Sequence, residues 1–160
     1  MNDMTLSTTN SEFTLSSLTT YEVGVMQSTA HRLTSKVKSQ FLSQYELTAM
    51  QWFALGYIND SSPDGMSLTA LKDILDTTMP FITNTINLLE SKGLIRKVTK
   101  PGDNRTKIVY LNPSYKPLIK QIEAGLRDEL RKELYGNDAI TRDELQTYVD
   151  VLYKMVEHRK

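Results

Sequence analysis

Residues 100–112 of this 160-residue chain read KPGDNRTKIVYLN, a turn sequence followed by a short apolar run. Pro-Gly and Asp-Asn favour turns, and the run KIVYL at 107–111 has the composition of a β-strand. Residues 94–99, LIRKVT, have the same composition on the other side of the turn. The three segments together predict a β-hairpin around a Pro-Gly-Asp-Asn turn.

Basic residues are concentrated around this hairpin, although the whole chain has no formal net charge. Residues 1–66 carry three basic and six acidic residues. Within residues 92–107, by contrast, Asp103 is accompanied by six basic residues: Lys92, Arg96, Lys97, Lys100, Arg105 and Lys107. A local basic patch on a neutral protein favours a specific anionic partner over general attraction to anions.

The composition excludes several classes of function. The chain has no cysteine, which excludes disulfides, thiolate metal sites and thiol redox chemistry. Its two histidines, His31 and His158, are too few for a transition-metal site. We find no glycine-rich phosphate loop and no catalytic constellation, so no cofactor, metal or enzymatic activity is expected. The lack of a signal peptide and of about 20 consecutive apolar residues predicts a cytoplasmic protein without membrane contact.

A shared helix-start pattern occurs in three segments: LTTYEV at 18–23, LTAMQW at 47–52 and ITRDEL at 140–145. In each, a threonine is followed three residues later by Glu or Gln, which forms a capping box. Apolar residues before the cap and at the fourth helical position add a hydrophobic staple. The pattern predicts that helices start at the three threonines, Thr19, Thr48 and Thr141.

Capping and helix-breaking residues predict three more helices. These are a short helix from Ser67, a helix from Thr77 or Thr78 to Gly93 with Pro80 in its first turn, and a long helix after Pro113. The order is four helices, a β-hairpin and two helices. Its middle portion is a helix-turn-helix followed by a wing. The predicted fold class is therefore mainly α with a small β-hairpin wing, a winged helix-turn-helix.

The first, fifth and sixth helices each carry an apolar stripe, although a winged-helix unit closes its own core without them. A second copy of the chain offers the same stripes, which predicts a homodimer. The alternative is that these helices fold back on their own domain. The expected organisation is a flexible tail (1–15), an N-terminal dimerisation helix (16–46), a winged helix-turn-helix region (47–112) and C-terminal dimerisation helices (113–160).

The chain resembles the MarR (multiple antibiotic resistance regulator) family over roughly residues 15–160. The resemblance rests on LTAMQWFAL, MSLTALKDIL, LLESKGLIRK and GDNRTKIVYLN, of which the last two are the most specific. It implies a dimeric transcription factor whose partner is double-stranded DNA with a pseudo-palindromic operator. It also implies a repressor that leaves DNA when a small effector, often aromatic and anionic, binds between the dimerisation and DNA-binding regions.

The resemblance implies an effector site near His31 and Trp52. Each residue has an alternative role. His31 on the first helix is also compatible with a surface or dimer contact. Trp52 occupies the staple position of its helix and is also compatible with the core.

The fourth helix is the expected DNA-recognition helix. A helical wheel places Ile82, Ile86 and Leu89 toward the core. The opposite face is small, neutral and polar, which suits the major groove, although a solvated face is the alternative. The expected DNA-contacting residues are Pro80, Phe81, Thr83, Asn84 and Asn87. Many members of the family carry an arginine on this face and this chain has none, which shifts specificity toward DNA shape and the wing.

In the wing, the resemblance includes the Asp-x-Arg pair Asp103 and Arg105. We expect Arg105 to enter a narrow, A/T-rich minor groove and Asp103 to hold Arg105 or the turn in position. The expected phosphate contacts are Arg96, Lys97, Lys100 and Lys107. The alternative for the pair is a surface salt bridge. The alternative for the chain is a winged-helix dimer that binds protein and not DNA.

Overall fold

The computed structural model describes residues 17–136 and 139–158. The expected tail at 1–15 lies outside these residues. The described residues fall into two compact units, one up to Leu33 and one from Thr34 onward, and each is described separately. The elements are α1 (Thr20–Ser43), α2 (Ala49–Asp60), β1 (Met66–Ser67), α3 (Leu68–Ile74), α4 (Met79–Ser91), β2 (Ile95–Lys100), β3 (Asp103–Leu111), a 3-10 helix (Pro113–Tyr115), α5 (Lys116–Glu133) and α6 (Arg142–Glu157).

All three predicted capping boxes are present. The Thr48 and Thr141 side chains accept hydrogen bonds from the N3 backbone, and the N3 side chains accept from the cap backbone. Thr19 makes the same reciprocal bonds with Glu22. Ser67 caps α3, as predicted. Thr78, and not Thr77, caps α4. Local sequence therefore determined where these helices begin.

The core of the second unit lies between α2, α3, α4, α5 and the sheet. Leu55 and Ile58 of α2, Ile82 and Ile86 of α4 and Ile122 of α5 are all 0% exposed. Full burial of one such side chain stabilises a fold by about 1.5–3 kcal/mol. Leu47 and Trp52, the residues of the predicted hydrophobic staple, are both buried in this core.

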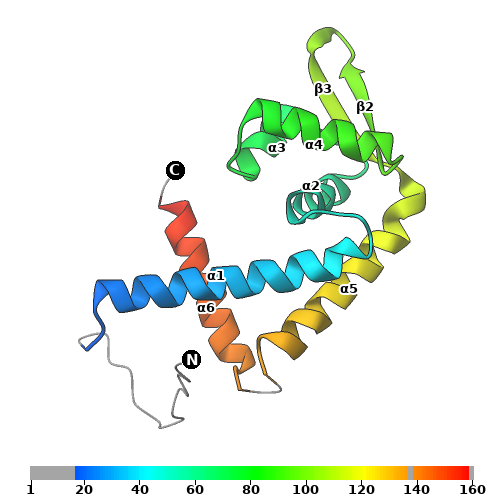
Figure 1. Cartoon of the computed structure of the whole chain (residues 1–160). Coiled ribbons are helices and arrows are strands. Elements are labelled where there is room, and N and C mark those ends of the chain that lie inside the picture. Colours follow the sequence, from blue (N-terminus) through cyan, green and yellow to red (C-terminus); the bar gives the residue numbers. More distant parts are fainter. Residues whose placement is uncertain (1–16, 137–138, 159–160) are drawn as a thin grey trace. The chain divides into compact units, whose positions relative to one another are not determined.

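The sheet has three antiparallel strands in the order β1-β3-β2. The hairpin β2–β3 was predicted, and Figure 1 shows it projecting beyond α3 and α4. Strand β1, which pairs Met66 with Val109, was not predicted because two residues show no alternation. Gly65 precedes it with a φ of +75°, and a Cβ there would lie 2.6 Å from the Tyr110 ring. This close approach brings β1 against β3.

The helices that follow the hairpin differ from each other. The apolar stripe of α5 was expected to need a second copy, but Ile119, Ile122 and Leu126 are buried in the core of their own chain. Gly125 permits this packing, because a Cβ there would lie 2.6 Å from Phe41 Cζ. These three residues of α5 thus pack on their own domain, and a role of α5 in dimerisation stays a prediction. Helix α6, in contrast, has no buried residue.

Helix α1 also exposes apolar side chains in the first unit, including Tyr21, Val25, Met26 and Leu33. Within the described part of the chain, no helix combines the length and apolar character needed to cross a bilayer.

Candidate nucleic-acid interface

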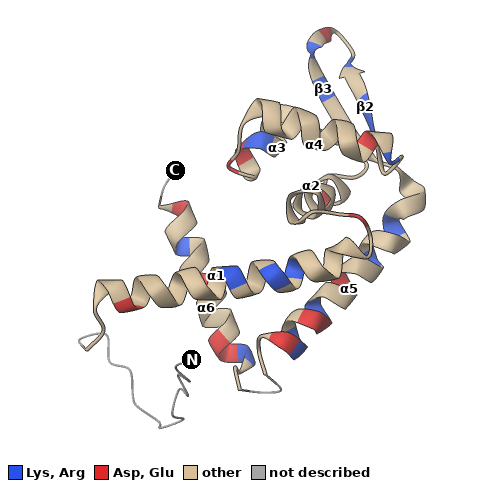
Figure 2. Cartoon of the chain, viewed as in Figure 1, with Lys and Arg blue, Asp and Glu red and all other residues tan. Residues whose placement is uncertain are grey.

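Helix α4 presents the face that the helical wheel predicted. Ile82, Ile86 and Leu89 are fully buried, whereas Pro80, Asn84 and Asn87 are exposed and Thr83 is half-buried. Phe81 keeps 44% of its surface exposed at the start of the helix. The exposed side of α4 therefore carries small polar groups, the Phe81 ring and the aliphatic side chains of Met79 and Leu88. Glu90 is the one charged residue of α4, and Figure 2 shows the rest of this ribbon without charge.

The wing consists of β2, β3 and their turn, and its base (residues 95–99 and 107–111) holds its basic side chains against neighbours. Lys97 Nζ donates to Asn87 Oδ1 at 2.6 Å and lies 3.4 Å from Glu90 Oε2. The Lys97 backbone N–H donates to Glu90 Oε1 at 2.9 Å. Lys97 therefore connects β2 to α4.

Three further cations of the basic segment have partners. Arg96 stacks over the Tyr110 ring, with Cζ 4.8 Å from the ring centroid. Lys107 Nζ donates to Thr99 Oγ1 on the paired strand. Lys92, which follows α4, donates to the Glu46 carbonyl. These contacts position the wing and the loop between α1 and α2. The expected phosphate role of Arg96, Lys97 and Lys107 stays a prediction.

The wing tip (residues 100–106) is built differently from the expected four-residue turn. Only Pro101 and Gly102 form the turn, Gly102 has a φ of +79°, and β3 already begins at Asp103. Thr99 pairs with Lys107, but Lys100 pairs with Asp103, so residues 104–106 form a bulge on β3. Bulges re-aim side chains away from the regular sheet. Arg105 lies in the middle of this bulge and is exposed.

Asp103 holds the bulge together. Its carboxylate accepts the Arg105 backbone N–H at 3.0 Å and the Thr106 hydroxyl at 2.6 Å. These bonds, Thr106 first, hold the pKa of Asp103 below its ordinary value. Within the described residues, Asp103 makes no ion pair with the Arg105 guanidinium, so the surface salt bridge considered from the sequence is not formed. Lys100 and Arg105 likewise have no side-chain hydrogen bond or ion pair there.

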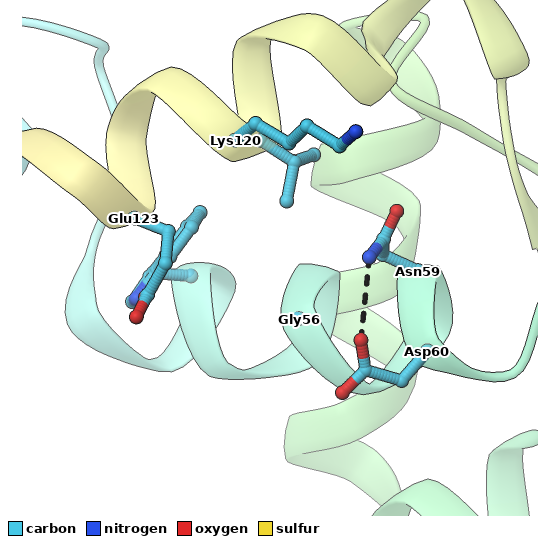
Figure 3. A pocket seen from close by; sticks show the side chains of 7 residues that line it. Gly56, Asn59, Asp60, Lys120 and Glu123 are labelled. Atoms are coloured by element: carbon cyan, nitrogen blue, oxygen red, sulfur yellow. Dashed lines mark hydrogen bonds between the residues drawn. The ribbon is translucent and has the colours of Figure 1, made fainter.

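A cavity of about 380 Å³ lies apart from this surface, between α2 and α5. Figure 3 shows Gly56, Asn59 and Asp60 contributed by α2, and Lys120 and Glu123 by α5. The Trp52 ring and Ile119 supply apolar lining. Trp52 is 7% exposed, so it belongs to the core and also borders the cavity. A Cβ on Gly56 would meet no atom within 4 Å, which leaves the space above α2 open.

His31 lies on the exposed surface of α1 in the first unit. His31 lines a shallow surface hollow together with Gln27, Ser28 and Arg32, and all four residues belong to α1. The sequence paired His31 with Trp52 in one effector site; that pairing stays a prediction. Among the described residues, no group of three or more His, Asp or Glu side chains is placed to hold a metal ion.

Residues 45–106 match the model of the MarR family. Among solved structures, a MarR transcription factor from Planctomyces limnophilus is 26% identical, with a TM-score of 0.68, and the match covers 85% of this chain and 96% of that one. The S. aureus MepR–DNA complex is 23% identical, with a TM-score of 0.69 and coverage of 92% and 99%.

A third similar structure is Bordetella bronchiseptica BpsR, whose DNA binding is regulated by 6-hydroxynicotinic acid. It is 21% identical, with a TM-score of 0.71, and the match covers 84% of this chain and 98% of that one. The family match spans the helix-turn-helix and most of the wing described above. The middle of the chain therefore matches the MarR family model, and the chain has the winged-helix fold of the MarR-family structures to which it is similar.

Proposed function

We propose that this chain is a sequence-specific, DNA-binding repressor that places α4 in the major groove and the wing tip in the adjacent minor groove. The observation that carries the proposal is the pair of surfaces on one unit: an uncharged polar face on α4 and a bulge that exposes Arg105. A narrow minor groove attracts arginine because its negative potential is concentrated there. MepR, with the same fold, was crystallised as a DNA complex.

The exposed apolar face of α6 supports a homodimer. Val149, Leu152 and Val156 are 55%, 39% and 59% exposed, and they recur at helical spacing. A second copy would cover this face with the same residues, as two-fold symmetry requires. The dimer would bring two α4 helices to successive major grooves, about 34–36 Å apart.

Dimerisation is tested by replacing Val149 and Leu152 with glutamate. We expect the double variant to sediment as a monomer while keeping its helical circular dichroism, because α6 contributes no buried side chain to the core of its own chain. Lys154→Glu, on the same helix, is the matched control and should remain dimeric. A wild-type chain that is monomeric at micromolar concentration would contradict this part of the proposal.

The cavity between α2 and α5 is the proposed effector site. The Trp52 ring offers a stacking surface for a small aromatic ligand. Asp60 and Glu123 place two carboxylates in the lining against the single ammonium of Lys120. This balance favours an aromatic ligand with a positive or hydrogen-bond-donating group, in contrast to the anionic effector that the family resemblance suggested.

Two probes of matched shape separate these ligand classes: benzamidine, a cation, and benzoate, an anion. Trp52 is the sole tryptophan of the chain, so its fluorescence reports directly on the cavity. We expect tighter binding of benzamidine, and Glu123→Gln should remove that preference. Gly56→Leu should fill the open space above α2 and block both probes while leaving DNA binding intact. Tighter binding of benzoate than of benzamidine would contradict the proposal that the cavity prefers a positively charged ligand.

The function as a whole is tested by selecting ligands for the purified protein from randomised DNA duplexes. The proposal expects a pseudo-palindromic site with A/T-rich positions where the wing tips lie. If no sequence is enriched even at low salt, the alternative of a protein-binding winged-helix dimer takes its place.

A further inference from the structure

Lys97 brings a positive charge onto the exposed face of α4, which carries no basic residue of its own. It lies on β2, ten residues beyond Asn87, and its Nζ reaches Asn87 Oδ1 at 2.6 Å. Glu90 fixes Lys97 in place: its Oε1 accepts a hydrogen bond from the Lys97 backbone N–H at 2.9 Å, and its Oε2 forms an ion pair with the ammonium at 3.4 Å. The Lys97 side chain keeps 24% of its surface exposed. The Lys97 side chain is therefore anchored without being fully buried.

This contact determines which way the Asn87 amide faces. A lysine ammonium has three donors and no acceptor, so only the amide oxygen of Asn87 can face it. The NH₂ group of Asn87 must then point away from Lys97. Because Asn87 lies on the exposed face of α4, this NH₂ group is the part of the amide left for an external partner.

An asparagine in this state is poorly suited to adenine. Bidentate pairing with adenine needs the amide oxygen to accept from N6 while the NH₂ donates to N7. The Asn87 oxygen is already engaged, and an adenine amino group approaching it would meet the Lys97 ammonium, which is also a donor. Guanine presents two acceptors, N7 and O6, in the same groove. Two adjacent donors, the Asn87 NH₂ and the Lys97 ammonium, match that pattern.

We propose that Asn87 and Lys97 form one composite, donor-only site that selects guanine over adenine in each half of the operator; this rests on the DNA-binding function proposed above. Lys97 supplies from the wing the cation that α4 lacks, and Glu90 is the positioning residue that holds it there. The base preference at this position belongs to two residues from different elements.

The test compares the sequences selected from randomised duplexes by the wild type and by three variants. Asn87→Ala identifies the half-site position that Asn87 reads, because preference is lost there. At this position the wild type should favour guanine over adenine by roughly 5- to 100-fold, as expected for a good two-bond base contact. Lys97→Met should abolish this preference or shift it to adenine, since the Asn87 oxygen is then available.

Lys107→Met is the matched control, because Lys107 lies on the same hairpin and donates to Thr99, not to α4. It should lower affinity and leave the guanine preference unchanged. Lys97→Arg keeps the positively charged donors and should retain the preference for guanine. Thermal unfolding establishes that each variant is folded.

Two results would overturn the inference: a wild-type preference for adenine at the Asn87 position, or identical base profiles for Lys97→Met and Lys107→Met. Failure of the wild type to select any sequence would contradict DNA binding itself, so the two proposals fail in distinguishable ways.

Discussion

The base and the tip of the wing carry similar charges but use them differently. At the base, Arg96 stacks on Tyr110, and Lys97 is held by Asn87 and Glu90. At the tip, Lys100 and Arg105 have no side-chain hydrogen bond or ion pair within the described part of the chain. At the base, Lys97 connects the hairpin to α4, and Arg96 and Lys107 contact partners within the hairpin. The two tip cations have no such side-chain partner in the described residues.

A count of basic residues therefore does not give the charge available to a partner. The sequence showed six cations in one short segment, and the structure engages four of them internally. Asp103 is the one acidic residue of that segment, and it builds the bulge that presents Arg105. The Asp103 carboxylate thus helps to expose Arg105, although Asp103 itself does not bind an anionic partner.

Removal of the Arg105 side chain should have the largest effect on DNA binding. We expect Arg105→Ala to weaken binding to the selected duplex by about 1–3 kcal/mol, or roughly 5- to 150-fold. It should also remove the A/T preference at the outer positions, because no guanidinium would enter the narrow groove. Arg96→Ala at the base is the matched control and should cost less affinity. Equal losses for the two variants would remove the distinction between base and tip.

Asp103→Ala distinguishes two effects of Asp103 on DNA binding: its support of the bulge and its negative charge. Removal of an acidic residue raises the net positive charge of the wing, so electrostatics alone predicts tighter DNA binding. Loss of the bonds to Arg105 N–H and Thr106 predicts the opposite, because the bulge loses its support. We expect affinity to fall several-fold in a binding isotherm at fixed salt. Tighter binding would show that Asp103 only offsets positive charge.

Lys100→Gln should have a smaller effect, expressed mainly in the salt dependence. If Lys100 neutralises one phosphate, the slope of log affinity against log salt should decrease by about 0.9. Base preferences should remain unchanged, since a phosphate contact carries no sequence information. An altered base profile would instead place Lys100 at a base edge.

The smallest expected effect is a pH dependence of the wing tip. The pKa of Asp103 is below its ordinary value in the folded state, so its bonds contribute stability above the unfolded-state pKa. That contribution is lost as pH falls through the folded-state pKa, in the range below about 4. An NMR titration of the Asp103 carboxylate measures this directly. Thr106→Val should raise the pKa of Asp103, and an unchanged value would contradict the bond.

The parts of the fold that depend on local chemistry were predictable. Thr19, Thr48 and Thr141 begin their helices as their capping boxes indicated, and Ile82, Ile86 and Leu89 are buried as the wheel indicated. Strand β1 was missed because two residues are too short for an alternating pattern. Helices α5 and α6 are both amphipathic, and periodicity cannot tell which stripe is buried within its own chain.

The residues of the candidate interface were predictable, but their contacts were not. The outward residues of α4 follow from a helical wheel, and the basic wing follows from composition. The bulge at residues 104–106 depends on strand register, which a one-dimensional pattern does not determine. The Lys97–Asn87 bond joins two elements whose distance apart is set by tertiary packing. Neither feature follows from the spacing of residues along the chain.

DNA binding through the wing tip is tested by the salt dependence of duplex binding for three proteins. These are the wild type, Lys100→Gln/Arg105→Gln at the tip and Arg96→Gln/Lys107→Gln at the base. We expect the wild type to bind its selected site with an affinity that falls steeply with salt. The tip pair should reduce the slope by up to about 1.8, at about 0.9 for each phosphate contact, and the base pair by clearly less. Absence of wild-type binding at low salt, or equal slopes for the two pairs, would contradict DNA binding through the wing tip.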